Sequence, residues 1–288
     1  MAPARIGVVT GANKGIGLAI VRQLALQYPM SHIENGSFLI YLTSRDDIRG
    51  REAVASLEQE LQKSRVLATE GGTTEIKHHQ LDISDSKSIE TLANFLGKEH
   101  PDGIDFVINN AGIALEGFNN DVVKKTIACN YYSTLEATRA WIPTLKSDGR
   151  IVNVASISGA LNKYSRSIRD RFIKAKAVDD VTNLMEEFTA AVAKGTHEAD
   201  GWPSAAYAVS KAGEIAQTRA IAKELKDDGS KILINSCHPG WVVTDMTKGK
   251  GTKTADQGAQ TPVQLAIEDI GGKSGTYWSD EREVDWTA

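Results

Sequence analysis

Short runs of apolar residues recur along the chain. They are rich in β-branched side chains and contain few polar residues, which is typical of strands covered on both faces of a parallel sheet. The runs are Ile6–Thr10, Phe38–Thr43, Phe106–Asn109, Ile151–Ala155 and Ile232–Cys237. A more polar run, Glu75–Leu81, predicts a strand near a sheet edge.

Between these runs lie stretches whose apolar residues repeat with the helical period. The clearest positions are Ile16, Ile20, Leu24 and Ala25 in one stretch, and Ala53, Leu57 and Leu61 in the next. Strands that alternate with helices imply right-handed βαβ crossovers and a doubly wound parallel sheet. Because no proline-rich or glycine-rich linker divides the chain, we predict a single α/β domain over residues 1–288.

Two segments look inserted into this alternation. "PMSHIENGS", at 29–37, lengthens the link between the first helix and the second strand, and its role cannot be read from its residues. A larger segment occupies about 159–203, and within it Asp179 and Asp180 are placed to cap a helix. The apolar stripe of that helix is Val181, Leu184, Met185, Phe188 and Val192. We expect this helix to pack on the main domain.

Composition narrows the functional classes. The chain of 288 residues is 41% hydrophobic and 24% charged, with a net charge of −4, so no global attraction to nucleic acid or an anionic membrane is expected. Its two isolated cysteines, Cys129 and Cys237, fit a reducing compartment. Since the N-terminal stretch lacks a signal-peptide core and no run approaches the ~20 apolar residues of a membrane span, we predict a cytoplasmic protein.

A glycine-rich turn, "VVTGANKGIGLAI", joins the first strand to the first helix. Gly11, Gly15 and Gly17 permit a tight turn and let backbone N–H groups approach a pyrophosphate at a helix N-terminus. The turn differs from a P-loop because Lys14 precedes Gly15 and no Ser or Thr follows to hold magnesium. This position favours dinucleotide binding over a purely structural turn.

The end of the second strand, "LTSRD", indicates which dinucleotide is bound. An acidic residue near this point usually bonds the ribose 2′-hydroxyl, whereas an arginine accommodates a 2′-phosphate. Arg45 comes first, followed by Asp46 and, one helical turn later, Arg49, while Lys14 adds a cation on the same side. These residues predict NADP(H). The alternative is that Asp46 turns inward and bonds the ribose of NAD.

The stretch "SAAYAVSKAGEI" places Tyr207 four residues before Lys211, so on a helix both side chains lie on one face. A cation beside a phenol stabilises the phenolate and makes the phenol a better acid. On spacing alone the pair is more simply explained as two surface residues, because any helix contains many such pairs. The chemical interpretation depends on the rest of the chain.

Several motifs occur together in a fixed order. They are "TGANKGIG" (Thr10–Gly17), "LDI" (Leu81–Ile83), "NNAG" (Asn109–Gly112), Asn130, Ser156, "YAVSK" (Tyr207–Lys211) and "PGWVVTD" (Pro239–Asp245). In this the sequence resembles the short-chain dehydrogenase/reductase family over nearly its whole length, which implies a Rossmann-like fold. The long insertion before the tyrosine, "GWPS" just ahead of it and "CHPGWVVTDM" are most similar to the carbonyl reductase branch.

The resemblance implies a catalytic role for four residues. Tyr207 would donate a proton to a carbonyl oxygen, and Lys211 would lower the phenol pKa and bond the nicotinamide ribose. Ser156 would hydrogen-bond the substrate oxygen, with Ser158 as the fallback because the strand motif reads "NVAS". Asn130 would hold a water behind the lysine. The alternatives are that Ser156 only caps a strand end and that Asn130 only bonds a kinked helix.

The resemblance also implies a binding site around these residues. The cofactor would contact Gly11, Asn13, Lys14, Gly15, Ile16, Gly17, Arg45, Arg49, Asp82, Ile83, Asn110, Ala111, Gly112, Tyr207, Lys211, Pro239, Gly240, Val242 and Thr244. The substrate would contact Ser156, Tyr207 and Trp241, although Trp241 in ordinary core packing is an equal alternative. No metal is predicted, because His78, His79, His197 and His238 lack the spacing of metal ligands.

The predicted function is NADPH-dependent reduction of a ketone, aldehyde or quinone. Three alternatives stay open: an NADP-binding sensor or scaffold without turnover, an NAD-dependent alcohol dehydrogenase of the same fold, and a sugar-nucleotide epimerase or dehydratase. The last usually carries a larger C-terminal substrate domain, for which this chain has little room. Because the inserted helix enters where compact family members pair, we predict a monomer with a small-molecule carbonyl substrate and no nucleic-acid or membrane partner.

Overall fold

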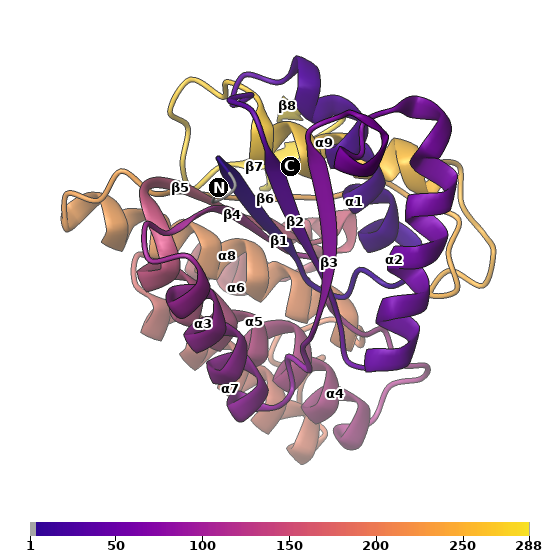
Figure 1. Cartoon of the computed structure of the whole chain (residues 1–288). Coiled ribbons are helices and arrows are strands. Elements are labelled where there is room, and N and C mark those ends of the chain that lie inside the picture. Colours follow the sequence, from indigo (N-terminus) through magenta and orange to yellow (C-terminus); the bar gives the residue numbers. More distant parts are fainter. Residues whose placement is uncertain (1–3, 288) are drawn as a thin grey trace.

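The computed structural model describes residues 4–287. A central eight-stranded sheet has the order β3-β2-β1-β4-β5-β6-β7-β8, and only its last neighbours, β7 and β8, pair antiparallel (Figure 1). The strands are β1 Arg5–Val9, β2 Phe38–Ser44, β3 Thr74–Gln80, β4 Ile104–Asn109, β5 Leu145–Val154, β6 Leu233–Cys237, β7 Tyr277–Ser279 and β8 Arg282–Glu283. The predicted α/β fold with a doubly wound parallel sheet is therefore confirmed.

The six predicted strands correspond to β1 to β6, and the polar β3 does lie at the sheet edge. The strand predicted at Ile151–Ala155 begins earlier, at Leu145, because Leu145 pairs with Ile104 before a register shift. The first half of β5, "LKSDGR", is polar and half-exposed, so the apolar pattern does not reveal it. The short strands β7 and β8 were not predicted.

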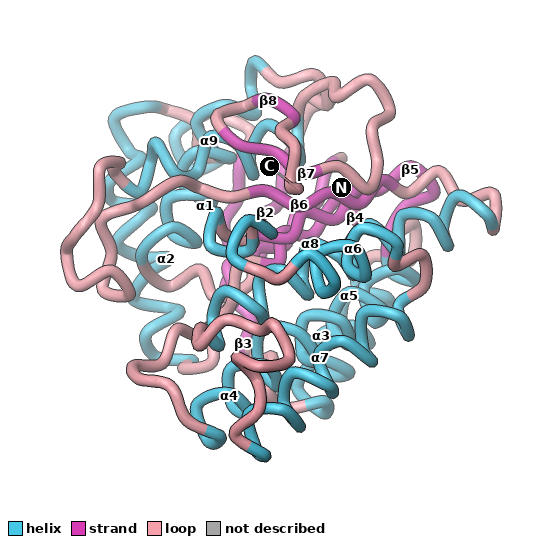
Figure 2. Tube along the Cα trace, turned by 180° about the vertical axis from the view of Figure 1, so that it is seen from behind, coloured by secondary structure: helices cyan, strands magenta, loops and turns pink. Residues whose placement is uncertain are grey.

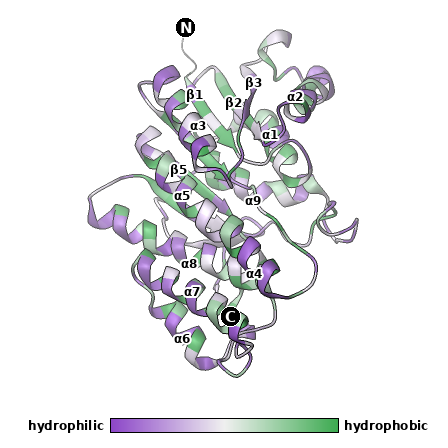
Figure 3. Cartoon of the chain, turned by 90° about the horizontal axis from the view of Figure 1, so that it is seen from below, coloured by the Kyte–Doolittle hydropathy of each residue, from purple (hydrophilic) through white to green (hydrophobic). Residues whose placement is uncertain are grey.

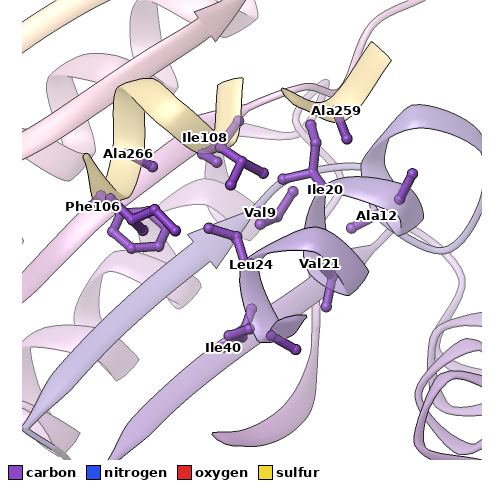
Figure 4. Close-up of a cluster of buried hydrophobic side chains, with 14 of the residues drawn as sticks. Val9, Ala12, Ile20, Val21, Leu24, Ile40, Phe106, Ile108, Ala259 and Ala266 are labelled. Atoms are coloured by element: carbon purple, nitrogen blue, oxygen red, sulfur yellow. The ribbon is translucent and has the colours of Figure 1, made fainter. Parts of the chain in front are cut away.

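Helices cover both faces of the sheet, as Figure 2 shows from behind. They are α1 Gly15–Gln27, α2 Asp47–Leu61, α3 Ser86–Glu99, α4 Asn120–Ile127, α5 Thr134–Trp141, α6 Arg166–Lys174, α7 Val178–Lys194, α8 Ala206–Asp227 and α9 Ala255–Ile267. Helices α1, α2 and α9 pack on one face, and α3, α5 and α8 on the other. Figure 4 shows the first of these cores, where Val9 and Ile108 of the strands lie with Ile20, Leu24 and Ala259 of the helices.

The inserted segment folds onto the main domain, as expected. Val181, Leu184, Met185 and Phe188 of α7 are buried in a third apolar cluster with residues of α4 and α8. The approach of α7 to α8 is close, since a β-carbon on Gly213 would lie 2.7 Å from the Met185 sulfur. Hydrophilic residues are frequent on α6 and α7, whereas β1 and β2 are mostly hydrophobic (Figure 3).

The start of α7 is capped by one of the two predicted acids. Asp180 accepts hydrogen bonds from the backbone N–H groups of Lys176 and Ala177, at 2.9 and 3.1 Å. Asp179 lies in the same first turn, where a negative charge also suits the helix dipole. These contacts fix the point at which the insertion turns into the helix that covers α8.

The shorter insertion, 29–37, packs at the opposite end of the sheet from the motifs. Tyr28, just before it, stacks on Phe38 with ring centroids 4.3 Å apart, and Arg5 donates a hydrogen bond to the Ile33 carbonyl at 2.8 Å. Arg5 and Phe38 begin β1 and β2, whereas the motifs follow the carboxyl ends of the strands. This segment therefore supports the amino ends of the strands and does not contribute to the site described next.

Candidate active site

The motifs gather at the carboxyl edge of the parallel sheet. The chain leaves β1 and β4 in opposite directions, so the strand order reverses between these two neighbours. In open α/β sheets such a switch point forms a crevice that binds ligands. Segments after β1, β2, β3, β4, β5 and β6 bring together the predicted residues Gly11–Gly17, Arg45, Asp82, Asn110–Gly112, Ser156 and Pro239–Thr244.

The glycine turn opens this crevice. Gly11 has φ +63°, and a β-carbon there would lie 2.9 Å from the Ala111 α-carbon, so the turn packs directly on the segment after β4. Helix α1 starts at Gly15 and no side chain caps it. Asn13 and Lys14 lie just before this helix. The first backbone N–H groups of the helix are therefore free to bind an anion such as a pyrophosphate.

The segment after β4 is tied to the same turn by hydrogen bonds. Thr10 Oγ1 accepts from the N–H groups of Asn110 and Ala111, both at 3.0 Å. The Asn110 amide donates to the carbonyls of Thr10 and Gly11, at 2.9 and 3.1 Å. The side chains of Asn110 and Thr10 thus hold the segment after β4 against the glycine turn. The sequence motif did not reveal this structural role.

The cations predicted for the adenosine end differ in their surroundings. Lys14 forms an ion pair with Asp245, 2.6 Å apart, which lowers the pKa of that carboxyl below its ordinary value. Asp46 caps α2, since its carboxylate accepts from the Arg49 N–H at 3.0 Å. Within residues 4–287 the exposed Arg45 side chain has no hydrogen-bond or ion-pair partner, and it is thus available for a phosphate.

The segment after β3 is anchored by its own side chains. Asp82 accepts hydrogen bonds from the Ser84 N–H and hydroxyl, at 2.9 and 2.6 Å, and the Asp82 N–H donates to Ser88 at 3.0 Å. The Ile83 side chain is buried in the core cluster with α3 and α5. Of the two residues predicted to contact the cofactor here, Asp82 is thus better placed than the buried Ile83.

Tyr207 and Lys211 lie in the first turns of α8 with both side chains on one face. The Lys211 ammonium nitrogen, Nζ, is 5.8 Å from the centre of the Tyr207 ring. Lys211 is buried, and its Nζ donates to the Val154 carbonyl at 3.0 Å and to the Glu214 carboxylate at 2.6 Å. A buried cation beside a half-buried phenol excludes the explanation of the pair as two solvated surface residues.

Ser156 lies two residues after the end of β5, and its carbonyl is fixed by a side chain of β7. Tyr277 Oη donates to that carbonyl at 3.0 Å. The Ser156 hydroxyl accepts a hydrogen bond from the Ser158 N–H at 3.1 Å, so its own proton is still available for another acceptor. The Ser156 hydroxyl thus caps a short turn and can still donate a hydrogen bond. No sequence pattern had indicated that Tyr277 would bind the Ser156 carbonyl.

Asn130 is fully buried in a π-helical turn, Ala128–Ser133, between α4 and α5. Its amide donates to the Ile113 carbonyl at 2.8 Å and to Ser210 at 3.0 Å, and its oxygen accepts from the Ile113 N–H at 2.8 Å. A β-carbon on Gly112 would lie 3.2 Å from the Asn130 oxygen and 3.6 Å from Lys211 Nζ. Asn130 and Lys211 therefore converge on the same glycine.

The loop after β6 returns toward the glycine turn. Gly240 has φ +84°, and a β-carbon there would meet the Lys253 side chain at 2.8 Å. Val242 is buried, and a β-carbon on Gly15 would lie 3.7 Å from a methyl carbon of Thr244. Together with the contact between Lys14 and Asp245, these contacts hold the loop after β6 close to the glycine turn.

Several exposed apolar side chains lie on the segments that carry the motifs. Half of the large hydrophobic residues exposed in the described part of the chain follow β4, β5 or β6: Leu115, Ile157, Trp241, Val243 and Met246. Trp241 is 53% exposed, which excludes ordinary core packing for its side chain. Exposed large apolar side chains on the segments that carry the motifs are candidates for contact with a ligand.

Metal ligands do not gather here. Within the described part of the chain, no three His, Cys, Asp or Glu side chains come close enough to hold a metal ion. Among residues 4–287, no helix has the length and apolar character needed to cross a membrane.

Comparisons with solved structures give the same architecture. Salutaridine reductase from Papaver somniferum superposes with a TM-score of 0.80 at 27% identity, covering 95% of this chain and 99% of that one. Menthone neomenthol reductase from Mentha piperita superposes with a TM-score of 0.75 at 28% identity, covering 95% and 97%. The fold is thus shared with known reductases over nearly the whole chain.

Sequence comparisons agree. Carbonyl reductase [NADPH] 1 of Homo sapiens is 38% identical and that of Bos taurus 37%, each over 292 residues that cover 98% of this chain and 98% of the relative. A family model described as short chain dehydrogenase matches residues 5–168 and 193–255, and its interruption falls within the inserted segment that carries α7. The chain belongs to the short-chain dehydrogenase family.

Proposed function

We propose that this protein reduces a carbonyl compound to an alcohol with NADPH as the hydride donor. The observation that carries the proposal is the buried Lys211 ammonium on the same face as the Tyr207 phenol. The names of the similar carbonyl reductases support NADP(H) as cofactor. When bound, NADPH supplies a hydride to the carbonyl carbon.

The side chains of this site would supply the proton. Tyr207 donates its phenolic proton to the carbonyl oxygen, and the neighbouring Lys211 cation stabilises the phenolate that is left. Ser156 donates a hydrogen bond to the same oxygen, where negative charge develops. Asn130 orders the backbone at Ile113 and, with a water molecule, would link Lys211 to solvent.

The chain also has groups suited to hold the cofactor. The uncapped start of α1 suits the pyrophosphate, and Arg45, with its forked guanidinium, suits the 2′-phosphate. Asp46 already caps α2, which favours this assignment over a ribose contact by Asp46. Lys14 would join Arg45 only by leaving Asp245 or by binding both.

Replacing Arg45 by alanine is expected to weaken NADPH binding by about 1.5–3 kcal/mol, as for the loss of a charge-assisted hydrogen bond. Binding of NADH, which has no 2′-phosphate, is expected to change little. Titration of both cofactors by fluorescence measures the two affinities. Arg51→Ala serves as the control, because Arg51 is an exposed cation of α2 that pairs with Asp47 and is not among the predicted cofactor residues. An equal loss for NADPH and NADH would place Arg45 away from the phosphate.

The substrate is proposed to be a largely apolar ketone, aldehyde or quinone, because exposed apolar side chains, Trp241 among them, lie on the segments that follow the carboxyl ends of the strands. Purified protein with NADPH or NADH and a panel of quinones, aryl ketones and aldehydes tests the function. Carbonyl-dependent oxidation of NADPH is the expected result. Binding of NADPH without turnover on any compound would favour a sensor or scaffold, and turnover of alcohols with NAD would favour a dehydrogenase.

We also propose that the protein is a cytoplasmic monomer. Helix α7 buries its apolar stripe against α4 and α8, a face that would otherwise be available for pairing between copies. Covering it within one chain avoids the entropy cost of association. Light scattering is expected to give a mass of 31.1 kDa. A mass of twice that value that persists on dilution would contradict the monomer.

A further inference from the structure

The buried carboxylate of Glu214, on α8, contacts the active-site lysine, Lys211. Glu214 Oε2 lies 2.6 Å from Lys211 Nζ, and the exposed fractions of the two side chains are 2% and 5%. The two residues are three positions apart, so α8 itself places them on neighbouring positions. The function proposed above gives Glu214 no part.

Few other charges compete for the lysine. The titratable groups that face the pair are Tyr207 on α8, Cys129 on the π-helical turn, Cys237 on β6 and Tyr277 on β7. Burial raises the pKa of Cys129, Cys237 and Tyr277, which keeps all three neutral near pH 7. Helices α4 and α7, which also pack on α8, contribute mainly apolar side chains.

Burial raises the pKa of the Glu214 carboxyl above its ordinary value, whereas the contact with Lys211 at 2.6 Å favours the carboxylate. Among the described residues, Glu214 is therefore the group placed to give Lys211 a negative counter-charge. Burial is the largest single influence on the pKa of Lys211 and lowers it, but the attraction and hydrogen bond to Glu214, together with the smaller influence of Tyr207 and Cys129, raise the pKa above its ordinary value. An ammonium buried without a counter-charge tends to lose its proton rather than stay charged. The charge that the reaction requires on Lys211 thus depends on this contact.

We propose that Glu214 is a positioning residue for the reaction, whose carboxylate keeps the Lys211 ammonium charged inside the fold and holds it between the Val154 carbonyl and the Tyr207 ring. The inference rests on the proposed function, because it assigns Glu214 to the same proton transfer. Glu214 does not touch the reacting atoms. It acts through the lysine, which donates to the Glu214 carboxylate and to the Val154 carbonyl at the same time.

The sign of the effect follows from electrostatics. Removing the carboxylate leaves the buried Lys211 ammonium without its counter-charge, so Lys211 would lose its proton at lower pH. The proposed proton transfer requires the Lys211 cation beside Tyr207. A variant without the carboxylate should therefore lose activity at a lower pH than the wild type on the alkaline side of the rate profile.

The experiment compares Glu214→Gln with Glu214→Asp in the full-length protein. Glutamine keeps the shape and an acceptor oxygen but removes the charge, whereas aspartate keeps the charge. The ratio kcat/KM for a quinone is measured against pH with saturating NADPH. For Glu214→Gln the alkaline limb is expected to move to lower pH by roughly 1 pH unit or more, and for Glu214→Asp to stay near its wild-type position. Circular dichroism verifies folding.

A role in packing alone would lower the rate equally at all pH values and leave the limb in place. An unmoved limb in a folded Glu214→Gln variant would overturn the inference. If Glu214→Gln does not fold, Glu214→Leu provides the same test, because it also removes the charge. The inference would also be overturned if the alkaline limb of Glu214→Asp moved as far as is expected for Glu214→Gln. A wild-type protein that does not oxidise NADPH with any carbonyl would instead overturn the proposed function itself.

Discussion

Replacement of Tyr207 by phenylalanine is expected to lower the turnover of carbonyl reduction by about 10²–10⁴-fold, as is typical for loss of a general acid. The change removes the phenolic hydroxyl but keeps the ring, so the packing of α8 and the buried position of Lys211 should be preserved. The affinity for NADPH should change little, because in the proposed mechanism the Tyr207 hydroxyl contacts the substrate oxygen and does not hold the cofactor. Steady-state kinetics and a fluorescence titration measure the two effects separately.

The matched control is Tyr28→Phe, which removes the same hydroxyl at the opposite end of the sheet. Tyr28 Oη accepts a hydrogen bond from the Asn35 N–H at 3.1 Å, and its loss should affect stability slightly and turnover not at all. Turnover of Tyr207→Phe within a few-fold of the wild type would exclude Tyr207 as the proton donor. Ser156 would then be the remaining hydroxyl that could donate to the substrate oxygen.

Replacement of Lys211 by methionine is expected to reduce both activity and stability. Methionine fills a similar space but leaves the Glu214 carboxylate buried without its counter-charge. Breaking a buried ion pair by removing one partner typically costs about 3–5 kcal/mol in the free energy of unfolding. Urea unfolding followed by circular dichroism measures this loss, and kinetics of the folded fraction measure the loss of the active-site cation.

The double variant Lys211→Met with Glu214→Leu separates the two effects. Because both charges are then removed, most of the lost stability should return, as is observed when buried ion pairs are replaced by apolar side chains. Activity should not return, since the cation beside Tyr207 is still absent. Full stability in the single variant would show that the pair is not charged, and recovered activity in the double variant would remove Lys211 from the mechanism.

Local sequence patterns were sufficient to predict the first six strands of the sheet, apart from the polar first half of β5, and the ordered set of motifs. Strands covered on both faces must be almost wholly apolar, so β1, β2, β4 and β6 are visible as short apolar runs. The carboxyl ends of parallel strands share one edge, so motifs that follow strands must meet there. The helical period also predicted α7, whose stripe had to be buried against some partner.

Contacts between distant segments were decided only by the tertiary structure. Lys14 and Asp245 are separated by 231 positions, and nothing local indicates that they form an ion pair instead of both facing solvent. Tyr277 reaches the Ser156 carbonyl from β7, a strand of three residues too short to show a pattern. Such pairs depend on the order of strands in the sheet, which sets which loops are neighbours.

Burial of charge was also decided only by the folded chain. Glu214 lies on a helix with small residues around it, and its sequence spacing from Lys211 is that of an ordinary surface ion pair. In the structure α4, α7 and the sheet enclose α8 on several sides, so the same pair is excluded from water. The spacing determined that Lys211 and Glu214 are neighbours, but the packing of segments far away in the sequence determined how strongly the two charges act on each other.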